Sequence, residues 1–191
     1  MAKTLLPIGP QVAKMLSQCI QKPLLRIAVR EEYLLREPRA HPTSTAVLRV
    51  TLDVGKYLAF YLRPGKESPA EHEVLCAEVV NHLDVQEKLT LHSDFTYYSN
   101  APYSGYRIYF LNLEDTIGQL IVGINLLIRR NKKSTLETPV EGFAFIFENG
   151  SILSCVIEPI TSKFCVPHQI SHSFIIEEGI PSSFHLASFS S

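Results

Sequence analysis

The chain has 191 residues, with 18 Lys and Arg against 19 Asp and Glu, and a formal net charge of −1 at pH 7. Hydrophobic residues make up 46% and charged residues 19%, a composition that excludes disorder over the whole chain. A dedicated nucleic-acid-binding domain carries a basic excess because it neutralises phosphates, so the charge balance argues against that class without excluding a local basic patch.

Two segments in the first half of the chain are expected to be helices. Residues 10–21 begin at Pro10 and repeat apolar side chains at helical spacing, which predicts one buried stripe. Residues 69–83 follow the sequence Ser68-Pro69-Ala70-Glu71, which has the serine, proline and glutamate of a capping box. Each segment is therefore predicted to pack one helix face against a core.

A third helix is expected from Asn112 to about Arg130, because its ends carry charges that complement a helix dipole. Acidic residues follow Asn112, and Arg129 precedes Arg130 at the other end. A wide apolar face lies between these ends, with Ile121 near its middle. We therefore predict that this is the central core helix and that a charge placed at Ile121 unfolds the domain.

Strands are expected to fill most of the remaining chain and to form consecutive antiparallel pairs. Alternating or β-branched segments predict strands at residues 24–35, 45–52, 56–62, 88–98, 106–111, 140–147 and 151–157, with one or two more within 164–176. The turn Glu148-Asn149-Gly150 is the strongest hairpin signal. The predicted fold is α+β, with a mostly antiparallel or mixed sheet and two to three packed helices. It forms a single domain, residues 1–178, followed by a C-terminal arm, residues 179–191.

The four cysteines are spread along the chain, at Cys19, Cys76, Cys155 and Cys165. No secretory signal is expected ahead of them, so they are interpreted as reduced, buried thiols. The longest apolar run, residues 117–128, contains Gln119 and Asn125 and falls short of the roughly 18 residues that a transmembrane helix needs. We therefore expect a cytoplasmic or nuclear protein without a transmembrane segment.

No segment combines catalytic residue types with catalytic spacing. The sequence has no phosphate-binding loop, dinucleotide fingerprint, nucleophile elbow or H-E-x-x-H motif. We therefore expect no cofactor and favour a non-enzymatic interaction or assembly protein. Such a protein would be a subunit of a complex, or a viral or effector-type accessory protein.

Exposed aromatic side chains and a sheet edge are expected to dock a protein partner or a second copy of the chain. Tyrosines cluster around the turn at Pro102, and apolar side chains recur along the C-terminal arm without the periodicity of a core. The residues predicted to bind the partner are Tyr97, Tyr98, Tyr103, Phe184, Leu186 and Phe189.

A nucleic-acid-binding protein is the alternative, because tyrosines also stack on single-stranded bases. The same three tyrosines would act with a basic patch at the end of the third helix, which comprises Arg129, Arg130, Lys132 and Lys133. A third hypothesis is a small hydrolase or transferase with an unrecognised site near His92 and Asp94, which alternate onto one face of a predicted strand.

Four residues of zinc-ligand type occur late in the chain, at Cys155, Cys165, His168 and His172. Their spacing is C-x9-C-x2-H-x3-H, in which only the last three residues have the short separations of a structural zinc site. Cys155 has the apolar neighbours of a core strand residue. We therefore predict that no metal is bound and that this set is the weak candidate for a site.

Overall fold

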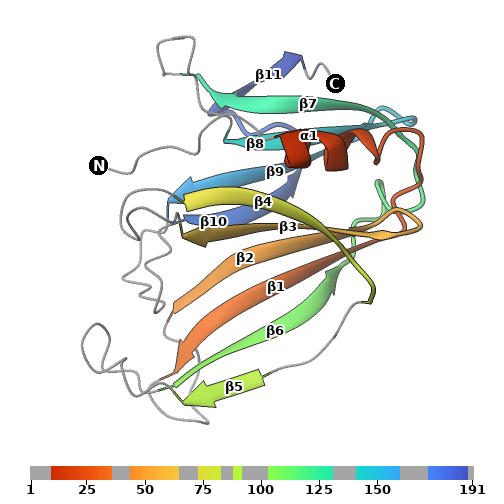
Figure 1. The fold of residues 1–191 in the computed structure, drawn as a ribbon. Coiled ribbons are helices and arrows are strands. Elements are labelled where there is room, and N and C mark those ends of the chain that lie inside the picture. Colours follow the sequence, from red (N-terminus) through yellow and green to blue (C-terminus); the bar gives the residue numbers. More distant parts are fainter. Residues whose placement is uncertain are drawn as a thin grey trace.

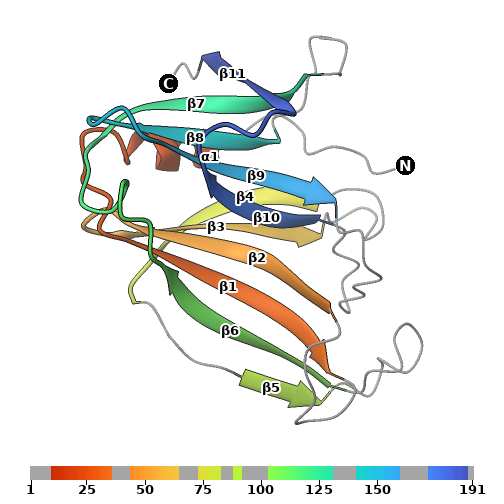
Figure 2. The ribbon, with the colours of Figure 1, turned by 180° about the vertical axis from the view of Figure 1, so that it is seen from behind.

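A computed structural model of the chain describes residues 10–35, 44–64, 73–82, 88–91, 103–130, 141–159 and 172–188. These residues form two antiparallel sheets, whose apolar faces pack against each other, and one short helix (Figures 1 and 2). The prediction of an α+β fold with two to three helices is therefore wrong, since the described protein is nearly all-β. No helix in this described part is long and apolar enough to cross a membrane.

The first sheet has six strands in the order β4-β3-β2-β1-β6-β5, and each strand is antiparallel to its neighbours. A bulge after Arg30 shifts the pairing between β1 and β2 by one residue. The strands are β1 Arg26–Leu35, β2 Ser44–Asp53, β3 Tyr57–Pro64, β4 Glu73–Val80, β5 Lys88–Leu91 and β6 Tyr103–Leu111.

The second sheet has five strands in the order β10-β9-β8-β7-β11. They are β7 Ile121–Arg129, β8 Gly142–Phe147, β9 Ile152–Pro159, β10 His172–Glu178 and β11 Phe184–Ser188. The predicted hairpin around Asn149 is confirmed, because β8 pairs with β9 and Gly150 has the positive φ, 84°, that such a turn requires. The edge strand β10 lies beside β2, where the Val47 N–H donates a hydrogen bond of 2.9 Å to Ser173 Oγ.

The main core lies between the two sheets and is rich in phenylalanine. Phe60 of β3 contacts Phe143 of β8, with ring centroids 5.1 Å apart, and Phe143 meets Phe145 edge to face at 5.4 Å. Such tilted arrangements are favourable for aromatic rings and add to the burial of their large apolar area. The inner faces of the sheets therefore hold most of the apolar side chains.

The helix α1, Pro10–Ser17, confirms the first predicted helix, although it ends earlier than expected. Its apolar stripe of Val12, Met15 and Leu16 is buried in the main core. Gln11 Nε2 also donates a 2.6 Å hydrogen bond to the carbonyl of Ala77 in β4, the edge strand of the six-stranded sheet. The helix therefore covers an edge that would otherwise present unpaired backbone groups.

The predicted helix over residues 69–83 is wrong, because residues 73–80 form β4 and pair with β3 over eight residues. The capping sequence that suggested this helix lies outside the described residues. The segment reads Glu-Val-Leu-Cys-Ala-Glu-Val-Val, in which three valines favour a strand. Pairing with β3 and burial of Ala77, which is 1% exposed, outweigh the local helix signal.

The predicted central helix from Asn112 is also wrong, because the segment forms turns and then β7. Ile121, Ile124 and Leu127 are buried three residues apart, which imitates helical spacing. A bulge between Ile121 and Gly123 breaks the strand's alternation, and Ile124 and Leu127 face opposite sides of the sheet. The helical period therefore arises from a bulged strand with both faces buried.

The outer face of the five-stranded sheet carries a small second core. Residues 179–188 run from β10 to the opposite edge of the sheet, where β11 pairs with β7 (Figure 2). On the way, Ser154 Oγ donates a hydrogen bond to the carbonyl of Gly179. Phe184 is fully buried there against Leu127, Ala144 and Val156. The chain thus covers part of this face with its own segment.

Candidate functional site

The outer face of the six-stranded sheet has a row of small side chains across its central strands. Ala28 of β1 pairs with Thr51 of β2, which pairs with Ala59 of β3. These three residues are at most 4% exposed although they lie on the face away from the main core. Longer side chains beside them therefore rise above the row and form the walls of a groove.

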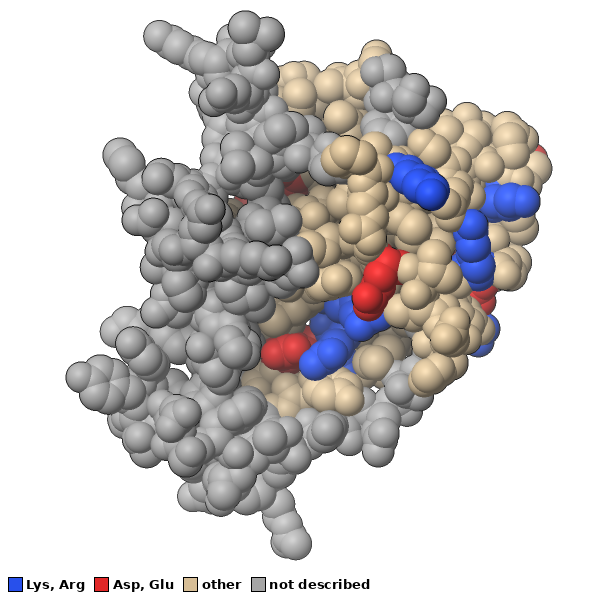
Figure 3. Space-filling model, in the orientation of Figure 1, with Lys and Arg blue, Asp and Glu red and all other residues tan. Residues whose placement is uncertain are grey.

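One wall comes from an adjacent row of paired residues, in which Arg30 lies opposite Arg49. On the other side of the small residues Arg26 pairs with Asp53, and neither of these two residues lines the groove. The groove encloses about 390 Å³, and Figure 3 shows acidic and basic side chains meeting in a hollow of this face. Its lining comprises Ala28, Arg30, Arg49, Thr51, Glu78, Val79, Val80, Asn81, His82, Tyr106 and Ile108.

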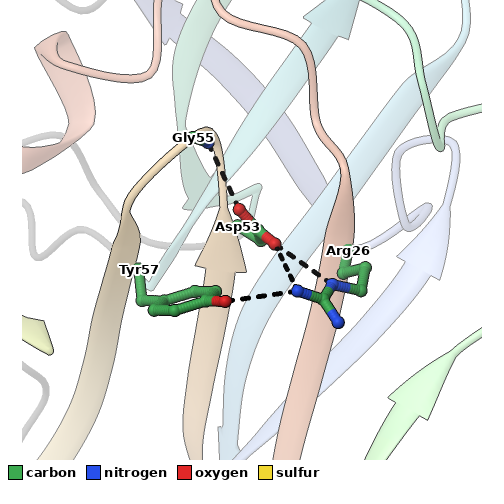
Figure 4. A network of polar contacts seen from close by, with 4 residues as sticks. All are labelled: Arg26, Asp53, Gly55 and Tyr57. Atoms are coloured by element: carbon green, nitrogen blue, oxygen red, sulfur yellow. Dashed lines mark hydrogen bonds and ion pairs between the residues drawn. The ribbon is translucent and has the colours of Figure 1, made fainter. Parts of the chain in front are cut away.

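Beside the groove, Arg26 Nε and Nη2 donate to Asp53 Oδ2 at 3.1 and 3.0 Å (Figure 4). Arg26 Nη2 also donates to the hydroxyl of Tyr57 at 3.2 Å, and the backbone N–H of Gly55 donates to Asp53 Oδ1 at 3.2 Å. The hydrogen bond to Asp53 raises the pKa of Arg26 above its ordinary value. Asp53 therefore ties the turn between β2 and β3 to the arginine of β1.

The arginines that line the groove form two further arginine–carboxylate pairs. Arg30 Nη2 lies 3.0 Å from Glu32 Oε1, and Arg49 Nη2 donates to Glu78 Oε1 at 2.9 Å. The guanidinium carbon of Arg30 lies 4.0 Å from the ring centroid of Tyr106, in cation–π geometry. Among the described residues Arg30 Nε has no hydrogen-bond partner and is shielded from solvent.

Two other guanidinium groups of this face also lie over aromatic rings. Arg49 is 5.8 Å from the ring centroid of Tyr61, and Arg26 is 5.4 Å from that of Phe110. Phe110 is nevertheless 42% exposed, which is high for so large an apolar side chain. The face therefore combines ordered arginines with aromatic area that solvent can reach, and its chemistry is suited to recognition of a planar or anionic group.

Three of the residues predicted to bind a partner, Tyr97, Tyr98 and Phe189, lie outside the described residues. Tyr103 is the first residue of β6. Phe184 and Leu186 belong to β11, where Phe184 is fully buried and Leu186 packs against the same small core. In this conformation the protein itself occupies the apolar surface of these two residues.

The predicted basic patch is divided by the structure, and Lys132 and Lys133 lie outside its described part. Arg129 Nε donates to Glu141 Oε2 at 2.6 Å, and its Nη2 donates to Glu158 Oε2 at 3.0 Å. Burial lowers the pKa of Arg129, but these two hydrogen bonds outweigh it and leave the pKa raised. Arg130 Nε donates to the carbonyl of Phe184 at 2.8 Å. Both arginines therefore hold the second sheet together.

The weak metal candidate is not assembled by the described residues, because Cys165 and His168 lie outside them. Cys155 pairs with Ile176 and His172 pairs with Pro159, so the two candidate ligands are four residues apart along the strands, roughly 13 Å. No group of three or more potential metal ligands occurs within the described segments. The sites suggested near His92 and Asp94 also lie outside them.

The buried cysteines are poor nucleophiles. Burial raises the pKa of the Cys19 thiol to about 12, and the nearby charge of Lys56 offsets this only in part. Burial likewise raises the pKa of Cys155. Both side chains therefore stay protonated at neutral pH, whereas a catalytic cysteine reacts as the thiolate.

The groove is the feature that sequence patterns alone miss. Alternation along residues 24–35 places Arg26 and Arg30 on one strand face, and this pattern is the sequence signal for this part of the sheet face. The contribution of Arg49 and Glu78 depends on strand order and register, neither of which is visible in the sequence. No protein-family model, curated protein or solved structure matches the chain.

Proposed function

We propose that the protein is a non-enzymatic interaction or assembly protein that docks a protein partner on the outer face of its six-stranded sheet. The observation that carries this proposal is the groove lined by Arg30 and Arg49, with Arg26 and the exposed ring of Phe110 beside it on the same sheet face. Arginine and large aromatic residues are enriched in the energetically important parts of protein interfaces.

The arrangement of these side chains favours binding because it is already ordered. Each arginine is held by a carboxylate and lies over an aromatic ring. Ordering a long side chain on association costs about 0.5–1.5 kcal/mol, and a side chain that is fixed beforehand avoids most of this cost. A partner therefore meets a preorganised surface.

The charge of the groove favours a protein partner over a nucleic acid. Asp53, Glu32 and Glu78 accompany the three arginines, so positive and negative charges are balanced. A nucleic-acid surface needs an excess of cations for the regularly spaced phosphates. The pairing of Arg129 with Glu141 and Glu158 further reduces the cationic surface of the second sheet.

A cytoplasmic or nuclear location is part of the proposal. Its support is the redox state of two described cysteines, since the buried Cys19 and Cys155 are free thiols. Free thiols are typical of proteins kept in a reducing compartment.

Site-specific photo-crosslinking in cells that express the protein tests the docking proposal. A photoreactive amino acid at Phe110 should give one discrete adduct with another protein, whereas the same group at Ile175, which is similarly exposed on the second sheet, should give none. The adduct should disappear when Arg49 is changed to Ala. Absence of a protein adduct at Phe110, or an adduct with nucleic acid, contradicts the proposal.

A further inference from the structure

We infer that the groove recognises a carboxylate, supplied by an aspartate or glutamate side chain of the partner and bound between Arg30 and Arg49. This inference rests on the proposed docking function and names the group that the partner inserts. Arginine is the residue best suited to binding a carboxylate, because its planar guanidinium group presents two parallel N–H donors that match the two carboxylate oxygens.

The first observation is that two like charges face each other. Arg30 of β1 and Arg49 of β2 are directly opposite in the strand register. Like charges at opposite positions of an antiparallel pair are destabilising. Their own carboxylates, Glu32 and Glu78, approach from different directions, one along β1 and the other from β4. A further carboxylate between the two guanidinium groups would relieve the repulsion that remains.

The second observation is the unpartnered donor of Arg30. Its Nη2 is paired with Glu32, but its Nε has no hydrogen-bond partner among the described residues. A shielded N–H group without an acceptor costs free energy, and a hydrogen bond from a ligand to this group recovers that free energy. A small turn of the guanidinium over the ring of Tyr106 would offer Nε to a group that enters the groove.

The third observation is the shape of the space beside these arginines. Ala28 and Thr51 form a low floor, and the groove of about 390 Å³ has room for a side chain. Val80 and Ile108 line the same space, so they can contact the methylene groups that carry a carboxylate. The site thus has cationic donors and an apolar wall, as an acidic side chain requires.

Charge selects a single carboxylate over a run of phosphates. The two arginines share the groove wall with Glu32 and Glu78, so the local charge is already balanced. One additional negative charge can be met by donors that the guanidinium groups still hold, since each has five N–H groups. A polyanion would bring several charges against these acidic residues.

Binding of a fluorescently labelled glycine peptide with one central glutamate and an amidated C-terminus to the full chain, followed by anisotropy, tests the inference. We expect saturable binding that weakens with added salt and falls about tenfold in R30Q and in R49Q, because a hydrogen bond to a charged group is lost. R107Q is the matched control, since Arg107 is an exposed arginine paired with Glu31 at 2.7 Å and does not line the groove. Its affinity should equal that of the unchanged protein.

R30K gives a sharper test, because lysine keeps the positive charge and removes the Nε donor. A tenfold loss in R30K as well supports a specific contact to Arg30, whereas full affinity in R30K overturns that part of the inference. Thermal melts identify any variant that fails to fold, and R49K then replaces R49Q.

Two outcomes overturn the carboxylate site. One is no binding of the single-glutamate peptide, or equal binding by R30Q, R49Q and R107Q. The other is binding of a single-stranded RNA that depends on Arg30 and Arg49 while the single-glutamate peptide does not bind, which would assign the groove to phosphate. The photo-crosslinked adduct at Phe110 is a separate result, so docking can stand when the carboxylate site fails.

Discussion

The outer face of the five-stranded sheet is partly covered by residues 179–188, whereas the outer face of the six-stranded sheet carries a groove that is open to solvent. The covered face contributes apolar side chains, such as Leu127 and Val156, and the open face contributes arginines, carboxylates and tyrosines. The comparison places a small second core on the covered face and the proposed docking site on the open one.

The two faces also use arginine differently. On the covered face Arg129 lies 4.7 Å from the ring centroid of Phe184 and bridges two strands, while Glu141 beside it is 5% exposed. On the open face the guanidinium of Arg26 is paired with Asp53 but remains half-exposed. The same residue type thus supports packing in one place and presents donors to solvent in the other.

The largest effect is expected in the core that both sheets share. Ile121→Asp should unfold the protein, because Ile121 is fully buried and lies in the main core. The change loses about 1.5–3 kcal/mol of burial and adds the cost of an unpaired carboxyl group, against a total stability of about 5–15 kcal/mol. Circular dichroism should show no cooperative melt. A folded variant would mean that the position of β7 in the core is wrong.

Phe184→Ala should give the next largest effect and tests whether the covered face is a true core. Removing this fully buried ring should lower the free energy of unfolding by about 3–5 kcal/mol. Urea titration with fluorescence or circular dichroism measures the loss. Phe110→Ala on the open face is the matched control and should cost only about 0.5–1 kcal/mol, through loss of its cation–π contact with Arg26. Equal effects in both variants would remove the distinction between the faces.

Arg129→Ala and Arg130→Ala should differ, because the two arginines make different contacts in the second sheet. Arg129→Ala removes the hydrogen bonds to the buried Glu141 and to Glu158 and should cost about 1–3 kcal/mol. Arg130→Ala removes one hydrogen bond to Phe184 and should cost about 0.5–1.5 kcal/mol. Denaturant unfolding of the two variants compares them directly. The reverse order would contradict the assigned contacts.

Tyr106→Ala should have the smallest effect on stability. It removes the ring under Arg30, a cation–π contact worth about 0.5–1 kcal/mol at an exposed site. Thermal denaturation should therefore detect a shift of only a few degrees. Tyr106→Phe keeps the ring and should restore the melting temperature, whereas a large loss in both variants would show that the open face is essential to folding.

Much of the strand pattern could be predicted from the sequence, because alternation and turn chemistry are local. The strands β1, β2, β3, β8 and β9 agree with the predicted segments within a few residues. The prediction of helices for the segments of β4 and β7 is wrong, because a capping sequence and helical spacing are local signals, whereas strand pairing is not local. In β7 the residues Ile121, Ile124 and Leu127 serve two separate cores, and no local pattern reveals the second one.

The candidate site was harder to predict, because it is made by register. Arg30 and Arg49 are far apart in the sequence and meet only because β1 and β2 pair in the register that places Arg26 opposite Asp53. Slipping the pairing by one residue would turn Arg49 to the other face. Phe184 and Leu186 are predicted to bind a partner because they are apolar. In the structure they pack against the five-stranded sheet for the same reason.

The order of strands along the chain has a consequence for how the molecule could be divided. Every described strand of the six-stranded sheet lies before residue 112, and every described strand of the five-stranded sheet lies after residue 120. Each layer is thus encoded by its own half of the chain, but the phenylalanine core between Phe60 and Phe143 belongs to both halves. Two fragments cut within residues 112–120 would each lack half of a core. Separately they would expose an apolar sheet face, and together they would have every contact needed to reassemble.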